Sequence, residues 1–174
     1  MATACPINFD VTSLRDQVRA TYEQVARDPS ADYHFHRGPE YAYRFLGYDP
    51  QELAQIPELS SARFAGVGNP LAIGQIETGA TVLDHACGAG MHLLLAARRI
   101  GSSGRAIGSD MTQAMLDCAS EAAQQAGLAG IAEFHLGFYE ELPVDDACVD
   151  TVLSTASTTP ARKRRLQNIC SSSR

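Results

Sequence analysis

The stretch Val82-Leu83-Asp84-His85-Ala86-Cys87-Gly88-Ala89-Gly90 decides the fold of this 174-residue chain. It joins a short apolar run at residues 80–84 to an apolar segment of helical length at residues 89–100. The turn between them is rich in glycine, and a carboxylate, Asp84, ends the apolar run. A strand, a glycine-rich turn and a helix in this order predict the opening of a β-α-β unit.

The same order continues along the chain. Short strands are expected at residues 105–109, 131–136 and 149–154, and a helix at residues 112–126 follows the second strand. Strands that alternate with helices of about a dozen residues are typical of a parallel sheet. The sequence therefore predicts an α/β fold, in which a parallel sheet of about four strands has flanking helices.

The N-terminal part has a helical pattern instead. Apolar residues recur every three or four positions over residues 10–28, which predicts an amphipathic helix that Pro29 ends. A second helix is expected at residues 40–46, and a third begins after Asp49, an N-cap acid followed by proline. The glycines and proline of Gly66-Val67-Gly68-Asn69-Pro70 predict a loop.

The charges divide the chain as well. Residues 1–154 hold all 20 acidic and 9 of the 14 basic residues, whereas residues 155–174 hold five basic residues and no acid. We predict a helical or lid region at 1–78, a cofactor-binding half-domain at 79–154, and a disordered, basic, Ser/Thr-rich tail at 155–174. An acidic body argues against a nucleic-acid partner, because phosphates bind basic surfaces.

Composition excludes several classes of protein. With 45% hydrophobic and 20% charged residues, the chain can form a core and is not a disordered polyampholyte. It shows neither a membrane-spanning segment nor a secretory signal. Five cysteines without a CxxC pair indicate reduced thiols and not a disulfide or zinc framework. We expect a cytoplasmic protein with no membrane partner and no metal centre.

An acidic residue stands at the end of each of the first two predicted strands. Asp84 ends the first, and Asp110 ends the second, twenty residues after Gly90. A carboxylate in the second position can accept hydrogen bonds from a ribose diol, and a tight glycine turn lets a ligand approach the backbone. The combination predicts a nucleotide-type cofactor site at the carboxyl ends of the strands.

The residues of the turn indicate which cofactor. A dinucleotide fingerprint needs a third glycine at position 93, where this chain has Leu93, and it would place Asp84 close to a pyrophosphate. S-adenosylmethionine carries an ammonium, a sulfonium and a ribose but no phosphate. We therefore expect S-adenosylmethionine, and we keep a dinucleotide-dependent oxidoreductase as the less favoured alternative.

These motifs resemble those of the arsenite methyltransferase-like family of S-adenosylmethionine-dependent (class I, Rossmann-like) methyltransferases. The similar stretches are residues 66–70, 82–90, 107–112, 137–140 with Leu142-Pro143, and 149–154. The resemblance implies a methyl transfer by direct displacement to a small, soft acceptor, with the glycine turn on the amino-acid part of the cofactor, Asp110 on the ribose, and Met111, Phe138 and Tyr139 at the adenine. The implied cofactor-binding residues are Asp84, Ala86, Cys87, Gly88, Gly90, Asp110, Met111, Thr112, Phe138 and Tyr139. No catalytic residue is identified, since such a displacement requires mainly in-line positioning.

The chain departs from the family pattern at three positions. Ala86 replaces the first glycine of the turn, which would weaken cofactor binding by ~1 kcal/mol if the position needs a positive φ. Val67 and Ala156 stand where the family carries the cysteines that bind trivalent arsenic. These two replacements argue against arsenite as the acceptor.

The resemblance ends after residue 154. We interpret residues 155–174 as a truncated or frameshifted C-terminus. Codons that encode Ser-Thr-Ala-Ser at 154–157 would encode Ser-Asn-Gly-Val after the insertion of one base, and that sequence is closer to the family. A sheet that stops after four strands exposes an edge through which copies could associate. The alternative function is therefore an inactive remnant that at most binds the cofactor.

Overall fold

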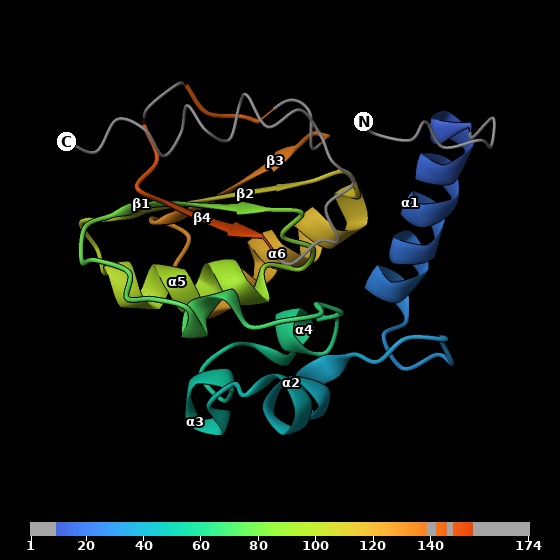
Figure 1. Cartoon of the computed structure of the whole chain (residues 1–174), viewed down its shortest axis with the longest axis horizontal. Coiled ribbons are helices and arrows are strands. Elements are labelled where there is room, and N and C mark those ends of the chain that lie inside the picture. The colour runs from blue at the N-terminus through green and yellow to red at the C-terminus, as the bar shows by residue number, and fades with distance from the viewer. Residues whose placement is uncertain (1–9, 139–141, 146–147, 155–174) are drawn as a thin grey trace, which may run out of the picture.

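The computed structural model describes residues 10–138, 142–145 and 148–154. Within these residues, four parallel strands form one sheet in the order β3-β2-β1-β4 (Figure 1). The strands are β1 (Thr81–His85), β2 (Arg105–Asp110), β3 (Ala132–Leu136) and β4 (Thr151–Ser154). The predicted parallel α/β sheet is confirmed, and each strand begins and ends within two residues of its expected limits.

Strand β1 lies in the middle of the sheet. Its Leu83 pairs with Ile107 of β2 on one side and with Val152 of β4 on the other. Because the strands are parallel and close to in register, their carboxyl ends meet at one edge. Asp84 and Asp110, four and six residues into their strands, therefore come to the same edge of the sheet.

Two helices cover one face of the sheet, below it in Figure 1. Helix α5 (Met91–Ile100) packs on β1 and β2, and nearly all of its side chains are buried. Helix α6 (Gln113–Gln125) packs on β2 and β3. Its buried residues are Met115, Leu116, Ala119, Ala122 and Ala123.

A smaller apolar cluster lies at the other face. Leu83 and Ile107 are fully buried there, although they point away from α5 and α6. They form a cluster with Val149, Leu142, Val144 and Val152. Segment 142–145 thus contributes to the core even though it belongs to no helix or strand.

The expected N-terminal helices are present. Helix α1 (Val11–Arg27) begins at Asp10, whose carboxylate accepts from the backbone amides of Thr12 and Ser13. Helix α2 (Gly38–Leu46) ends at Gly47, which has a left-handed φ of 71°. Helix α3 (Pro50–Leu53) starts at the Asp49 cap but lasts only four residues.

Two short elements were not predicted. They are helix α4 (Glu58–Ser61) and the 3-10 helix η1 (Pro70–Ala72). Elements of three or four residues are too short to show a hydrophobic period. The predicted loop at 66–70 is otherwise confirmed, since only Pro70 at its end enters η1.

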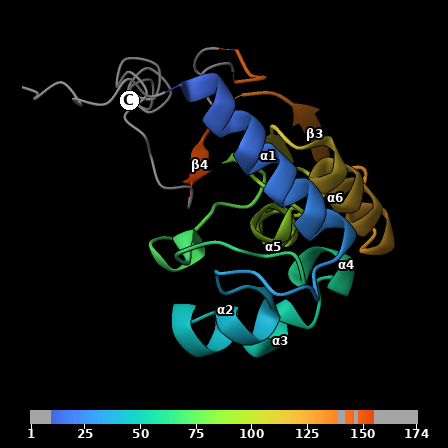
Figure 2. The same ribbon diagram turned by 90° about the vertical axis from the view of Figure 1, so that its right-hand side faces the viewer.

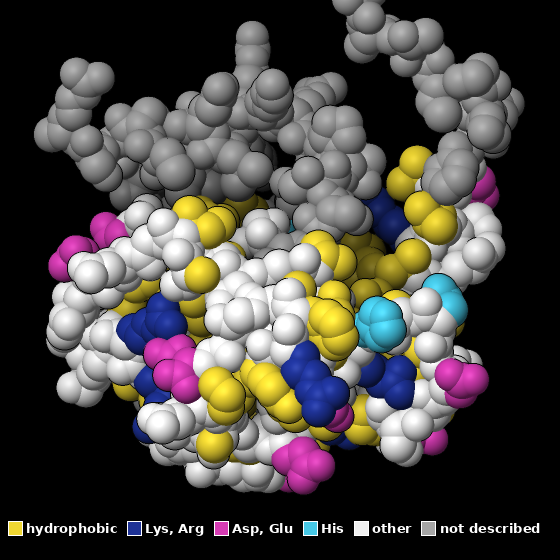
Figure 3. Space-filling view, turned by 60° about the horizontal axis from the view of Figure 1, so that its bottom comes forward, with side chains coloured by type: hydrophobic (Ala, Val, Ile, Leu, Met, Phe, Trp, Pro, Cys, Tyr) yellow, Lys and Arg dark blue, Asp and Glu magenta, His cyan; other side chains and the backbone are white. Residues whose placement is uncertain are grey.

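The N-terminal helices are joined to α5 by polar contacts. The Arg99 guanidinium donates to both carboxylate oxygens of Glu52 at 3.1 and 2.8 Å and to the Leu71 carbonyl at 3.0 Å. On the face shown in Figure 3, basic and acidic side chains lie beside one another among hydrophobic ones. Across the described residues, no helix combines the length and the hydropathy that crossing a bilayer requires.

Candidate functional site

The turn after β1 has an unusual backbone. Ala86 has a φ of 56°, and among the described residues no other non-glycine residue has a positive φ. Gly88 and Gly90 have φ values of 54° and 82°. The first position of the turn therefore has the left-handed conformation that favours glycine, which is the condition under which we predicted a penalty for Ala86.

The turn is packed tightly against its surroundings at Gly90. A Cβ atom placed there would lie 3.1 Å from Cβ of Ala119 and 3.3 Å from Cε1 of Phe134. Cys87 is buried against Gly108, where a Cβ atom would lie 2.9 Å from the Cys87 sulfur. These contacts fix the turn against α6, β2 and β3.

Asp84 is buried directly beneath the turn. Asp84 is only 1% exposed, and its Oδ2 atom has no hydrogen-bond partner. Burial, followed by the negative charge of Asp110, raises the pKa of Asp84 well above its usual value, while a backbone hydrogen bond from Leu93 opposes the rise. A buried carboxylate oxygen without a partner is unfavourable. A cationic ligand group would supply the missing partner, so this residue fits the ammonium of S-adenosylmethionine.

Asp110 lies across the turn from Asp84 and has a different environment. Its Oδ2 accepts a 2.9 Å hydrogen bond from the Gly88 amide, and its Oδ1 accepts a 2.8 Å bond from the Thr112 amide. Burial raises the pKa of Asp110, and these backbone bonds lower it in part. Thr112 is the buried N-cap residue of α6, and Met111 lies half-buried between the two.

The remaining predicted residues are only partly described. Phe138 follows β3 and is 41% exposed, and the Arg15 guanidinium carbon of α1 lies 5.1 Å from the centre of its ring. Tyr139 and Ala156 fall outside the described residues. Val67 is 71% exposed in the loop at 66–70.

Sequence reasoning missed one polar contact near the site. Tyr48 donates a 3.1 Å hydrogen bond to the Gly68 carbonyl and is also hydrogen bonded to Nε2 of His92, in the first turn of α5. Burial lowers the pKa of His92 to about 4. Burial and the charge of Asp84 raise the pKa of Tyr48. Nothing in the local pattern could have linked Tyr48 to His92, because they are 44 positions apart.

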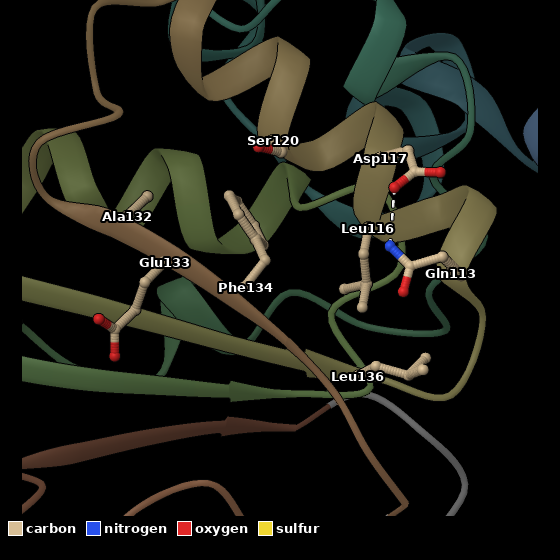
Figure 4. A pocket seen from close by; sticks show the side chains of 8 residues that line it. All are labelled: Gln113, Leu116, Asp117, Ser120, Ala132, Glu133, Phe134 and Leu136. Carbon is tan, nitrogen blue, oxygen red and sulfur yellow. Dashed lines mark hydrogen bonds between the residues drawn. The ribbon is translucent and has the colours of Figure 1, made fainter.

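A separate groove of about 250 Å³ runs along α6 and β3. Figure 4 shows Leu116, Phe134 and Leu136 lining it, with Gln113 hydrogen bonded to Asp117 at 2.7 Å. None of the predicted site residues lines this groove. In the described part of the chain, no group of three His, Cys, Asp or Glu residues is placed to hold a metal ion.

Comparisons with known proteins show to which family the chain is similar. A family model described as a methyltransferase domain matches residues 76–173. The chain is 38% identical over 109 residues to an arsenite methyltransferase from Halobacterium salinarum, and 33% identical over 96 residues to a 2-phytyl-1,4-naphtoquinone methyltransferase from Synechococcus elongatus. Its fold is similar to the crystal structure of an arsenic(III) S-adenosylmethionine methyltransferase from Chlamydomonas reinhardtii, with a TM-score of 0.53 and 32% identity.

These matches cover parts of each protein. They span 63% and 52% of this chain in the two curated relatives, and 59% of it in the crystal structure. The matched parts amount to 27% and 41% of the two relatives and 36% of the crystallised chain. The chain therefore matches less than half the length of each of these three proteins.

Proposed function

Since this chain belongs to the family of S-adenosylmethionine-dependent methyltransferase domains, we propose that it binds S-adenosylmethionine at the carboxyl ends of β1 and β2 and transfers a methyl group to a small, soft acceptor. The observation that carries the proposal is the buried Oδ2 of Asp84, which has no hydrogen-bond partner. A cationic, phosphate-free ligand satisfies that atom, whereas a pyrophosphate beside it would be repelled.

Each part of the site has a defined task in this proposal. Asp84 would hold the ammonium group of the cofactor, and the backbone of Gly88 and Gly90 would lie against its amino-acid part. Asp110 would accept hydrogen bonds from the ribose diol, because its carboxylate is already oriented by two backbone amides. Phe138 would lie at the adenine.

The bound cofactor supplies an electrophilic methyl group on a sulfonium. The protein's contribution is to hold the two reactants in line and to exclude water, and this kind of positioning alone can supply a large part of a rate enhancement. A thiolate is already deprotonated, and trivalent arsenic carries a free lone pair. Such soft nucleophiles therefore need no general base at pH 7. The absence of a recognisable base in the motifs is consistent with this chemistry.

Two observations bear on the identity of the acceptor. The relatives named for arsenite and arsenic(III) favour an arsenite-type acceptor. Val67 argues for a different soft acceptor, because an exposed valine offers no sulfur to trivalent arsenic. The alternative function is an inactive remnant of a methyltransferase. The positive φ of Ala86 favours this alternative, because a non-glycine residue in that conformation weakens the turn.

Calorimetry with S-adenosylhomocysteine tests the cofactor assignment, with NADH as the control. We expect binding of S-adenosylhomocysteine alone. Binding of NADH, or no binding by a folded sample, would overturn the assignment. Asp84→Asn and Asp117→Asn form a matched pair, since both remove one carboxylate but Asp117 is exposed on α6; only the first should lose affinity.

Turnover separates the enzyme from the remnant. Methyl transfer from labelled cofactor to arsenite or to small thiols would establish an enzyme, and the preferred acceptor would identify the substrate class. Cofactor binding without any transfer would favour the remnant. The Val67→Cys variant tests the role of the loop, because a gain of arsenite turnover would show that the loop contacts the acceptor.

We also propose that the protein is cytoplasmic and that it binds no nucleic acid. A further proposal is that copies of the chain associate through β4. In the described residues β4 pairs with β1 on one side only, and an unpaired strand is a template for association. Light scattering after gel filtration should give a mass above that of the 18.7 kDa chain. A monomer at all concentrations would remove the association proposal.

A further inference from the structure

Helix α1 crosses in front of the edge where the strands end. Figure 2 looks onto this side, and α1 runs across it in front of α5 and the sheet. Its C-terminal half packs on α6, where Val25 and Ala26 are buried with Ala89 of the glycine turn and Met115. The helix is therefore part of the surroundings of the candidate site, although its sequence carries no cofactor motif.

The C-terminal end of α1 is held in place by hydrogen bonds. The Ala26 carbonyl accepts a 2.7 Å bond from Nε of Arg63 and a 3.8 Å bond from the Cys118 sulfur. Asp28, one residue beyond the helix, caps the following turn through Ser30 and Ala31. A helix anchored in this way presents its side chains in a fixed orientation.

Tyr22 is a polar side chain that α1 brings to the site. It packs against the cluster formed by Val25, Ala89 and Met115, and its ring lies 6.2 Å from that of Phe35. Burial and the negative charge of Asp110 both raise the pKa of Tyr22. The phenol is therefore a protonated donor, and its ring packs against the cluster that contains Ala89, next to Gly88, whose amide is hydrogen bonded to Asp110. Within the described part of the chain, no hydrogen bond engages this hydroxyl directly.

We propose that the Tyr22 hydroxyl and the Asp110 carboxylate together recognise the ribose diol of the cofactor, so that α1 forms a wall of the adenosine site. This inference rests on the proposed function, because it assigns a residue to the same cofactor. Asp110 accepts hydrogen bonds, and Tyr22 both donates and accepts them, so the pair complements two vicinal hydroxyls. Arg15, nearer the N-terminal end of the same helix, covers the exposed ring of Phe138 and continues the wall toward the adenine.

The test measures the affinity of the full chain for S-adenosylhomocysteine and for its 2′-deoxyribose analogue. The key variant is Tyr22→Phe, which keeps the ring in its cluster and removes only the hydroxyl. We expect it to lose up to about tenfold in affinity for S-adenosylhomocysteine, the usual effect of losing one hydrogen bond between neutral groups. The same variant should bind the 2′-deoxy analogue almost as well as the unchanged chain does.

Tyr33→Phe is the matched control. Tyr33 packs in the same aromatic cluster, and its hydroxyl donates a 3.0 Å bond to the Asp28 carbonyl, away from Asp110. It should bind both ligands like the unchanged chain. A melting temperature for each variant shows that it is folded.

The outcomes are distinguishable. If the unchanged chain binds no S-adenosylhomocysteine, the proposed function and this inference fall together. If it binds and Tyr22→Phe binds equally well, the cofactor assignment stands and the inference is wrong. An equal loss for both ligands would also overturn it, because the hydroxyl would then act on the fold and not on the diol.

Discussion

The backbone amide of Gly88 donates a 2.9 Å hydrogen bond to Oδ2 of Asp110. This bond joins the glycine turn to the end of the neighbouring strand, and together with the Thr112 amide it satisfies both carboxylate oxygens. Asp84, on the other side of the turn, has a buried oxygen with no such partner. The two acids therefore differ: both carboxylate oxygens of Asp110 accept backbone hydrogen bonds, whereas one buried oxygen of Asp84 accepts none.

The environment of Asp84 predicts a dependence of stability on pH. Its pKa is raised in the folded chain, so above about pH 4 the unfolded chain ionises this group more readily than the folded chain does. The free energy of unfolding should therefore fall as the pH rises from about 4 toward the raised pKa. In Asp84→Asn the decline should be shallower, although the raised pKa of Asp110 leaves part of it. Urea titrations between pH 4 and 8 measure both slopes, and identical slopes would contradict the prediction.

The backbone of Ala86 predicts a stabilising substitution. Ala86→Gly removes a side chain from a residue with a φ of 56°, which should raise the free energy of unfolding by up to about 1 kcal/mol. Ala89→Gly is the control in the same turn, because Ala89 has no positive φ and its methyl group is buried. It should instead destabilise the chain by about 1 kcal/mol. If both substitutions shift the urea midpoint in the same direction, strain at Ala86 is not the cause.

The fold could be predicted from the sequence where the pattern is local and repeated. Residues 80–154 alternate between strands and helices, with glycine-containing turns between them. This alternation predicted that the strands of the sheet run parallel. The turn was predicted as well, because Asp84 and Gly90 occupy fixed positions relative to a strand and a helix. The penalty at Ala86 could be stated only as a condition, since φ is a property of the folded backbone.

Contacts between distant segments could not be predicted in this way. Tyr48 meets His92, and Tyr22 packs against the cluster that contains Ala89 of the turn, only because the N-terminal helices fold back onto the sheet domain. Hydrophobic periodicity gives the buried side of a helix but not the partner against which it packs. The amphipathic pattern of α1 therefore predicted a helix correctly, while its place beside the glycine turn came from the structure.

His92 predicts a loss of stability toward low pH. Burial lowers its pKa to about 4 in the folded chain, against about 6.5 when unfolded. The stability from keeping it neutral is fully present above pH 6.5 and is lost as the pH falls toward 4, by about 3 kcal/mol in total. The pH dependence due to His92 is opposite in sign to that due to Asp84. It is therefore measured as the difference in the free energy of unfolding between the unchanged chain and His92→Gln. The difference should shrink steadily between pH 6.5 and 4, and a constant difference would contradict the assignment.

The packing of Gly90 predicts a large cost for a single methyl group. In Gly90→Ala the new Cβ atom would approach Ala119 to 3.1 Å and Phe134 to 3.3 Å, at a φ of 82°. Gly127→Ala is the matched control, because Gly127 has a similar φ of 70° but no atom within 4 Å of the added group. The control should lose about 1 kcal/mol from its backbone conformation alone, whereas Gly90→Ala should lose at least about 2 kcal/mol.

Ligand binding distinguishes the two glycines further. The added methyl group at Gly90 can be accommodated only if the turn moves away from α6 and β3, and such a movement displaces Gly88, whose amide holds Asp110. Gly90→Ala should therefore also weaken S-adenosylhomocysteine binding about tenfold or more, while Gly127→Ala leaves it unchanged. Equal urea midpoints and equal affinities for the two variants would mean that the turn is not packed as tightly as the contacts at Gly90 indicate.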